Sequence, residues 1–294
     1  MTAQLDLTSP PGLLHGAMPG VSPDVYGEKD FKAVAQLVRE EAGIMLPPGK
    51  ATLVYSRLAP LVRASGLVTF AAFIDMIRAN AEERRKTICA LTTNHTFFYR
   101  EAHHFEHFTK IVRPHLVEML DHHEAVRMWS AGSSSGEEVF SLTMALLGPD
   151  RDEGRRIAKR DIRILASDIA DHALEKASRG RYEERDASGL PQDLRDLWTS
   201  TTQSHLEIGP EARSLVQFKR LNLQGDWPMQ RPFQVIFCRN VMIYFDQPTK
   251  ERLVERLAHQ LVPGGFLYIG HSERVSGPGD ALLNVVGPTI YQRK

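Results

Sequence analysis

The sequence is poor in the features that mark secreted, membrane-embedded or polyanion-binding proteins. Only two cysteines, Cys89 and Cys238, occur among 294 residues, too few for a disulfide framework. No apolar run approaches the roughly 18 residues that a membrane-spanning helix needs. The 36 Lys and Arg residues balance 36 Asp and Glu residues, which gives no support for a nucleic-acid coat protein or a polybasic membrane binder. We therefore expect a globular protein of a reducing cytoplasm.

Residues 1–26 also lack the pattern of a signal peptide, because no basic segment precedes an apolar core. Prolines and few charges predict a flexible tail instead. Residues 27–92 then show apolar residues at helical spacing and no strand candidate, which predicts a small helical bundle. Its four helices are expected from Asp30 to Ala42, from about Lys50 to Gly66, from Thr69 onward, and after the charged cluster Glu82–Lys86.

From residue 93 to residue 294 the pattern changes to short apolar runs that alternate with helix-length segments. Such runs are typical of parallel strands covered on both faces. A final pair of apolar segments surrounds a Gly-Pro turn and predicts an antiparallel edge. The fold class is therefore α/β, with a Rossmann-like doubly wound sheet. The expected strands are Val126–Ala131, Ile162–Ser167, Val235–Cys238, Phe266–Ile269, Leu282–Val286 and Ile290–Tyr291.

Residues 203–222 do not fit this alternation, since apolar residues lie on both sides of Gly209–Pro210. We interpret them as a β-hairpin in an inserted β-subdomain that covers about 200–222. Such an insertion can serve a partner or be a structural loop, and the sequence leaves both open.

The stretch WSAGSSSGEEVFSL, residues 129–142, predicts a strand, a tight turn and a helix. Gly132 and Gly136 suit a turn at the switch point of the sheet, where backbone must approach a ligand. The dinucleotide pattern G-x-G-x-x-G is missing, and two glutamates at a helix start would repel a phosphate. A cationic ligand without phosphate fits this turn better.

Asp168 ends the second expected strand, where a carboxylate can accept hydrogen bonds from both hydroxyls of a ribose. Glu137 can attract a cationic group. S-adenosylmethionine has a ribose, an α-ammonium and a sulfonium and carries no phosphate, so these residues favour it as the ligand. A turn with a purely structural role remains the alternative.

Six segments in this order resemble the bacterial chemotaxis receptor methyltransferases, the CheR family. The resemblance implies a helical N-terminal domain that recognises the receptor, and a class I S-adenosylmethionine-dependent methyltransferase domain with a β-subdomain. It also implies transfer of methyl to glutamate side chains of chemoreceptors, which gives methyl esters for sensory adaptation. The segments are LTTNHTFFYREAHHF (91–105), WSAGSSSGEEVFSL (129–142), ILASDIADHALEKASRGRY (164–182), RLNL (220–223), IFCRNVMIYF (236–245) and LVPGGFLYIGHSE (261–273).

Site residues are carried over from the resemblance motif by motif. Each has an alternative in a helix cap, a surface ion pair or core packing. The resemblance implies Asn94, Thr96 and Arg100 over the cofactor and acceptor, Glu137 and Asp168 on its amino and ribose groups, Asn222 and Leu223 near the adenine, Cys238, Arg239 and Asn240 along the cofactor, and Tyr244 near the reacting methyl.

The expected acceptor needs little activation. A glutamate carboxylate has a pKa near about 4.3 and is ionised at neutral pH, so no general base is required. We expect Arg100 to orient the acceptor carboxylate, because its planar guanidinium suits that shape. Tyr244 is the second expected catalytic residue, as a hydrogen-bond donor or as part of the methyl channel. No metal is expected: His103 and His107 have a possible ligand spacing, but no H-E-x-x-H order accompanies them.

The expected partner is the glutamate-rich cytoplasmic helical domain of a chemoreceptor. Lys50, Arg57 and Arg63 are spaced so that they could share a face of the second helix and bind it, although a solvated surface is the alternative. Some family members also grip a tether at the receptor's C-terminus through a glycine-bounded turn. The segment TSTTQSHLEIGPEA (199–212) lacks that turn, which makes tether binding doubtful.

Two competing functions stay open. One is a methyltransferase for nucleic acid or a small molecule, although the Asn/Asp-Pro-Pro-aromatic segment of the common amino-methylating enzymes is replaced here by RNVMIYF (239–245). The other is a non-catalytic module that senses S-adenosylmethionine or another nucleotide.

Overall fold

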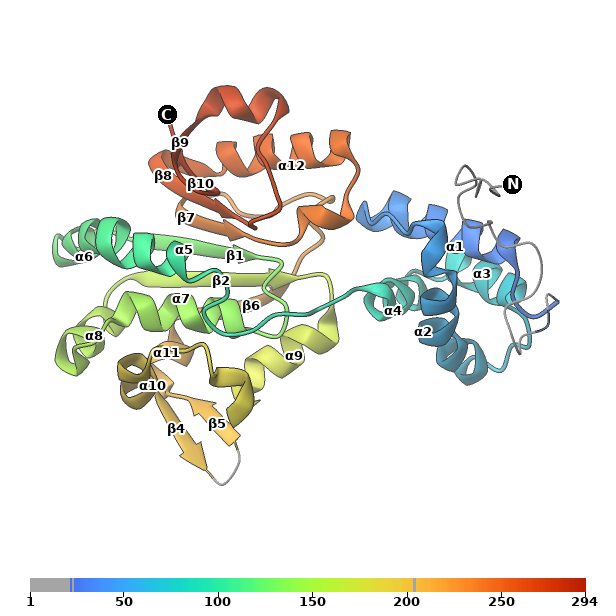
Figure 1. The fold of residues 1–294 in the computed structure, drawn as a ribbon, viewed down its shortest axis with the longest axis horizontal. Coiled ribbons are helices and arrows are strands. Elements are labelled where there is room, and N and C mark those ends of the chain that lie inside the picture. The colour runs from blue at the N-terminus through green and yellow to red at the C-terminus, as the bar shows by residue number, and fades with distance from the viewer. Residues whose placement is uncertain (1–21, 23, 203–204) are drawn as a thin grey trace, which may run out of the picture. The chain divides into compact units, whose positions relative to one another are not determined.

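The computed structural model describes residues 22, 24–202 and 205–294 (Figure 1). Two compact units meet in the chain between Thr92 and Thr93. Most of the segment expected as a flexible tail lies outside the described residues, but its end is not a tail. Tyr26 is only 2% exposed, its ring lies 4.5 Å from that of Phe70, and its hydroxyl donates to Ala51 O at 3.1 Å. This buried aromatic belongs to the helical unit.

The first unit contains α1 (Glu28–Ala42), the 3-10 turn η1 (Pro48–Lys50), α2 (Ala51–Ala64), α3 (Phe70–Ala79) and α4 (Ala81–Leu91). As expected, α1 ends at Gly43 in the left-handed conformation, and the Thr69 side chain caps α3 by accepting from Ala72 N. The expected start of the fourth helix is wrong. Asn80 caps α4 by accepting from Glu82 N and Glu83 N, so the charged cluster forms the first turns of the helix.

The second unit alternates strands and helices. Its helices are α5 (Ala102–His107), α6 (Arg113–Asp121), α7 (Glu137–Leu147), α8 (Arg151–Ala158), α9 (Asp171–Arg179), α10 (Gln192–Trp198), α11 (Pro210–Ser214) and α12 (Gln247–His259), with a π-helical turn η2 (Phe108–Val112) and 3-10 turns η3 (Glu184–Ala187), η4 (Met242–Tyr244) and η5 (Gly277–Leu282). Its strands are β1 (Val126–Ala131), β2 (Ile162–Asp168), β3 (Arg181–Glu183), β4 (Thr199–Thr202), β5 (His205–Ile208), β6 (Val216–Arg220), β7 (Phe233–Cys238), β8 (Leu261–Ile269), β9 (Leu283–Gly287) and β10 (Ile290–Arg293).

Seven strands form the main sheet in the order β6-β2-β1-β7-β8-β10-β9. The first five strands are parallel, and β10 runs antiparallel to both β8 and β9. This confirms the doubly wound sheet with an antiparallel edge. After β1 the chain builds outward through β2 and β6, then returns to place β7 on the other side of β1. The switch point therefore lies between the carboxyl ends of β1 and β7.

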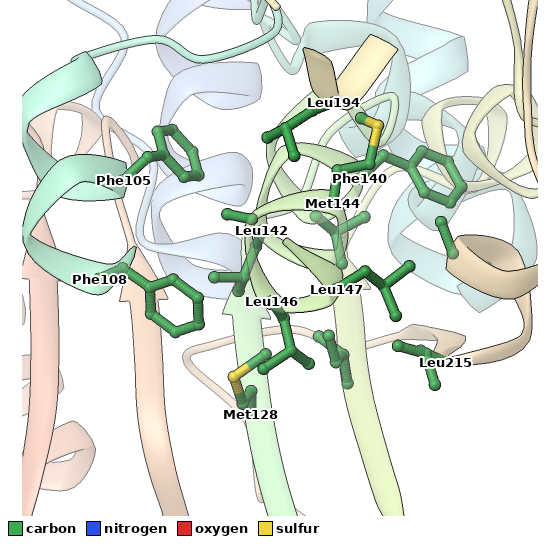
Figure 2. Close-up of a cluster of buried hydrophobic side chains, with 14 of the residues drawn as sticks. Phe105, Phe108, Met128, Phe140, Leu142, Met144, Leu146, Leu147, Leu194 and Leu215 are labelled. Atoms are coloured by element: carbon green, nitrogen blue, oxygen red, sulfur yellow. The ribbon is translucent and has the colours of Figure 1, made fainter. Parts of the chain in front are cut away.

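Helix α7 is buried along its whole length and anchors the turn before it. Figure 2 shows its apolar side chains in one cluster with Phe105 and Phe108 on one side and Leu215 on the other, and Leu194 belongs to the same cluster. Contacts on several sides fix the helix axis. The first residue of the helix, Glu137, is consequently held in place at the carboxyl edge of the sheet.

The expected β-hairpin over 203–222 is partly wrong. The inserted sheet is three-stranded, in the order β3-β5-β4, so it begins as early as Arg181. Gly209–Pro210 starts α11, and β6 pairs in parallel with β2 in the main sheet. A short apolar strand looks alike in sequence whichever sheet it joins, because its hydrogen-bond partner is distant in the chain. Gln203 and Ser204, between β4 and β5, lie outside the described residues.

Within the part of the chain that the structure describes, no helix is both long and apolar enough to cross a membrane.

Candidate functional site

The turn after β1 makes a close backbone approach at the switch point. Gly132 has φ +79°, and a Cβ there would lie 2.4 Å from Val241 Cγ2. The backbone N–H groups of Gly132 and Ser133 both donate to Ser167 O, at 2.8 and 2.9 Å. A larger residue at 132 would collide with the chain after β7 and would also strain the backbone. The glycine is therefore required by geometry.

Asp168, at the end of β2, faces this turn. Ser134 N donates to Asp168 Oδ2 at 2.8 Å, and Ala170 N donates to Oδ1 at 2.9 Å. Each carboxylate oxygen has two lone pairs, so each can still accept a second hydrogen bond. Burial raises the pKa of Asp168 above its usual range. The geometry is compatible with the expected contact to two ribose hydroxyls.

Glu137 opens α7 with its side chain only 3% exposed. Ser135 Oγ lies 2.7 Å from Oε2 and 3.0 Å from Oε1. Lys176 Nζ lies 3.4 Å from Oε1 and is 48% exposed. The carboxylate is thus held in place, and its only close cation in the described chain is a half-exposed lysine. An α-ammonium could share it.

Asn94 lies beside the same turn, since its carbonyl oxygen accepts from Ser134 Oγ at 3.0 Å. Its side-chain Oδ1 is buried with no hydrogen-bond partner within the described residues. A buried acceptor without a donor is unfavourable unless a ligand supplies one. The alternative role as a helix cap does not apply to Asn94 or Thr96, because Glu101 is the N-cap residue of α5.

Arg100 and Tyr244 both contact the segment 93–97. Arg100 Nη1 donates to His95 O at 3.1 Å, and its guanidinium lies 5.7 Å from the centre of the Phe97 ring. No ion pair of Arg100 occurs in the described part of the chain, so the alternative of an ordinary surface ion pair is not supported. The Tyr244 hydroxyl donates weakly to Thr93 O at 3.5 Å.

Cys238, Arg239 and Asn240 follow one another at the end of β7 but face different surroundings. Cys238 is fully buried, and burial holds the pKa of its thiol well above the usual value. The Arg239 guanidinium pairs with two largely buried carboxylates, those of Glu101 and Glu138, at 3.5 and 3.4 Å. Asn240 has φ 58°, and its backbone N–H donates to Glu273 Oε2 at 3.0 Å.

Three acids at this edge, the buried Glu273 and the partly buried Glu101 and Glu138, were not singled out as site residues from the sequence. Glu273 accepts hydrogen bonds from the backbone N–H groups of Asn240, Met242 and Gly270. It therefore ties the turn after β8 to the turn after β7. All three acids lie inside the segments that carry the family resemblance, yet only contacts distant in sequence reveal their role.

Asn222 and Leu223 follow β6, and a clamp from α12 holds their loop. Arg256 Nη1 donates to Leu223 O at 2.8 Å and Nη2 donates to Gly225 O at 2.6 Å. The same guanidinium stacks over the Trp227 ring at 4.0 Å. The sequence did not indicate a role for Arg256 or Trp227, since both lie outside the segment RLNL (220–223) that carries the family resemblance.

The three basic residues expected to share a face of α2 do not do so. Lys50 lies in η1, before the helix begins. Arg57 is turned inward, where Nη1 donates to Leu91 O at 3.1 Å and Thr92 O at 2.7 Å at the end of α4. Arg63 is exposed, but six residues span about one and two-thirds helical turns, which puts it on another side from Arg57.

His103 and His107 contact separate groups. His103 Nε2 lies 3.2 Å from Pro288 O, and His107 Nδ1 lies 2.9 Å from the Tyr268 hydroxyl. Among the described residues, no group of three or more His, Cys, Asp or Glu side chains could hold a metal ion.

Comparisons with known proteins cover both units. Residues 94–290 match the family model described as "CheR methyltransferase, SAM binding domain", and residues 29–92 match "CheR methyltransferase, all-alpha domain". The chain is 38% identical over 262 residues to a "Probable chemotaxis protein methyltransferase" of Rhizobium etli, covering 87% of this chain and 96% of the relative. It is 36% identical over 268 residues to the "Chemotaxis protein methyltransferase" of Escherichia coli, covering 89% of each.

Proposed function

Because this chain belongs to the CheR methyltransferase family, we propose that it transfers methyl groups from S-adenosylmethionine to glutamate side chains of chemoreceptors and forms glutamate methyl esters. The observation that carries the proposal is the pair of buried carboxylates, Asp168 and Glu137, at the switch point of a doubly wound sheet. Such a pair favours a cationic nucleoside over a dinucleotide phosphate. The acceptor would be a glutamate carboxylate, an anion that the Arg100 guanidinium can bind.

The residues at the carboxyl edge fit S-adenosylmethionine. Asp168 can accept from the ribose hydroxyls, Glu137 can hold the amino group, and the unpartnered Oδ1 of Asn94 offers a further acceptor. Leu223, only 7% exposed, can contact the adenine with Asn222 beside it. When bound, the cofactor supplies an electrophilic methyl group on a sulfonium.

The chain's own residues then have to orient an acceptor that is already ionised. Arg100 can hold the acceptor carboxylate through two parallel N–H donors. Tyr244 can donate its hydroxyl hydrogen to the same acceptor. No general base is needed, because the glutamate carboxylate carries its charge at neutral pH. Cys238 is unsuited to forming a covalent intermediate, since its buried thiol stays protonated. Catalysis on this view comes mainly from positioning.

The receptor's helical cytoplasmic domain is the partner we propose, and this places the enzyme in the cytoplasm. Lys50 and Arg63 are exposed and can face acidic receptor residues, whereas Arg57 is engaged with the end of α4. We also propose that a C-terminal receptor tether is not needed. The two residues between β4 and β5, Gln203 and Ser204, include no glycine, in contrast to the glycine-bounded turn associated with tether binding.

The test is to incubate the purified protein with S-adenosylmethionine labelled in its methyl group and with membranes that contain chemoreceptors. The expected label is on the receptor and is released by mild alkali, because carboxyl methyl esters hydrolyse in base whereas N-methyl groups do not. Receptors with and without their C-terminal tail should be labelled at similar rates.

Two outcomes would contradict the proposal. Alkali-stable label would indicate a methyltransferase for another acceptor group. Binding of S-adenosylhomocysteine by calorimetry, without any transfer to receptors, would favour a non-catalytic sensing module.

A further inference from the structure

The segment that carries Arg100 has a rare backbone conformation. Tyr99 has φ 56° and Glu101 has φ 59°, so left-handed residues lie on both sides of Arg100. Residues other than glycine adopt this region rarely and keep it only where surrounding contacts hold them. The contacts that hold these two neighbours therefore also fix the position of the Arg100 main chain, from which its side chain extends.

Three elements hold this segment. From α7, Ser141 Oγ accepts a hydrogen bond from Tyr99 N at 3.0 Å. From the turn after β8, His271 contributes its backbone N–H and its ring Nδ1, at 3.2 and 2.9 Å from Glu101 Oε1. From the end of β7, Arg239 Nη2 donates to the carbonyl oxygen of Arg100. Arg239 thus makes the side-chain contact to Arg100 itself.

The Arg239 guanidinium is enclosed by the protein. Its side chain is 1% exposed, with Nη2 3.5 Å from Glu101 Oε2 and Nη1 3.4 Å from Glu138 Oε2. It lies over the rings of Phe105 and Phe237, at 5.6 and 5.9 Å. A cation this deeply buried depends on both carboxylates for its charge balance.

The network extends to the two strands that border the switch point. Ser130, on β1, donates its hydroxyl to Glu138 Oε1 at 2.8 Å, and Arg239 directly follows β7. From these contacts we infer that Arg239 is a positioning residue for Arg100. It fixes the main chain of the Arg100 segment against β1 and β7, so that the Arg100 guanidinium is presented to the acceptor carboxylate. The inference rests on the proposed function, since that function assigns the acceptor to Arg100.

Lysine cannot replace arginine in this role. A guanidinium is planar and has five donors, so it can serve a carbonyl oxygen and two carboxylates at once, whereas an ammonium is a single compact point of charge. The Arg239→Lys variant keeps the charge that Glu101 and Glu138 need. It should therefore fold and still lose the fixed geometry.

The first test is receptor methylation by the full-length protein. In Arg239→Lys, kcat should fall roughly tenfold, while the Kd for S-adenosylhomocysteine stays within about threefold. In an Arg100→Lys background, the same change should add little further loss, because the group that Arg239 positions has already been altered. Independent losses that multiply in the double variant would overturn the inference.

The second test needs neither cofactor nor receptor. Hydrogen exchange by mass spectrometry should show faster exchange of peptides covering 97–103 in Arg239→Lys than in the parent protein. Unchanged exchange in this segment would also overturn the inference. If the parent protein transfers no methyl to receptors, the proposed function fails, but the exchange result still reports whether Arg239 fixes the segment.

Arg113 provides a matched control. It is an arginine of intermediate burial, with a side chain 13% exposed and paired with Glu153, and it donates to Leu146 O at 2.8 Å and Leu147 O at 3.2 Å. These contacts lie at the end of α7, away from the carboxyl edge of the sheet. Arg113→Lys should lower thermal stability while leaving kcat and the exchange of residues 97–103 unchanged.

Discussion

The Arg100 guanidinium can be tested separately from cofactor binding. In the described chain it donates to His95 O, lies against the Phe97 ring and interacts electrostatically with Glu138. Removing it should misplace the acceptor carboxylate. We expect Arg100→Ala to lower kcat roughly 100-fold in receptor methylation, the size of loss that misplacement of a reacting group causes. The Kd for S-adenosylhomocysteine, measured by calorimetry, should rise by less than about tenfold.

The control for this variant is Arg179→Ala. Arg179 is also cationic, but its side chain is 67% exposed and pairs with Glu175 within α9, so its loss should change kcat little. Equal losses of turnover and of cofactor binding in Arg100→Ala would defeat the proposed role of Arg100.

At the residue level, the sequence indicated which side chains lie at the carboxyl edge of the sheet. It did not indicate which groups each of these side chains contacts. Asp168, Glu137 and Asn94 lie around the turn after β1, with Asp168 at the end of its expected strand and Glu137 at the start of its expected helix. Arg239 was expected along the cofactor, yet its side chain pairs with Glu101 and Glu138. A motif gives the position of a residue in the chain, whereas the direction of a long side chain depends on charges that are distant in sequence.

Among the elements, α12 has a role that its sequence pattern does not reveal. Arg256 reaches across to the loop after β6 and holds Leu223 O and Gly225 O. We expect Arg256→Met to loosen this loop and to raise the Kd for S-adenosylhomocysteine about tenfold, which corresponds to about 1.4 kcal/mol. At saturating cofactor, kcat should stay close to that of the parent protein.

Arg252, one turn earlier on the same helix, is the matched control. Its Nη2 donates to Thr249 Oγ1 at 3.0 Å within α12. The prediction would be wrong if Arg252→Met weakened cofactor binding as much as Arg256→Met, because the loss would then come from the helix and not from the clamp on the loop.

The difference between a local sequence pattern and a contact distant in the chain also explains which strands were predictable. Strand β1 has the bounds expected from its apolar run, and β2, β7 and β8 contain theirs, because strands buried on both faces carry a continuous local signal. Strand β6 was assigned to the wrong sheet, and β3 was missed within a stretch that the sequence assigned to no strand. The pairing partner of β6 is β2, where Ile164 pairs with Val216 far along the chain. Strand β3 pairs with β5 across α10, for example Arg181 with Glu207. Local patterns do not encode such partners.

For the molecule as a whole, stability should depend on pH through a buried histidine. His104 on α5 is fully buried, and its Nε2 lies 2.9 Å from Thr289 Oγ1. Burial, with the charges of Arg239 and His103, holds its pKa below the usual 6.5, although Glu101 opposes this. A lowered pKa means that the unfolded chain binds the proton more readily, so His104 contributes stability above pH 6.5 that is lost as the pH falls.

Because His104 binds one proton at most, its contribution to the free energy of unfolding can fall by no more than about 1.4 kcal/mol per pH unit below pH 6.5. Asp168, Glu138 and Glu273 act in the opposite direction, because burial raises each pKa and the folded state then binds protons more readily. The total pH profile therefore mixes several groups. Comparing the parent protein with His104→Gln cancels the contributions of these three acids, which are common to both. Glu101, which lies 3.4 Å from His104, has a pKa below its usual value and stays ionised between pH 6.5 and 5.

Urea unfolding can be followed selectively for the unit that holds His104. All three tryptophans, Trp129, Trp198 and Trp227, lie beyond residue 92, so their fluorescence reports on the second unit. The parent protein should be the more stable at pH 7.5, and its advantage over His104→Gln should shrink between pH 6.5 and 5. His115→Gln, at a side chain 72% exposed, should show no such trend. A stability difference between parent and His104→Gln that stays constant across this range would mean that His104 takes up its proton equally well in the folded and unfolded states.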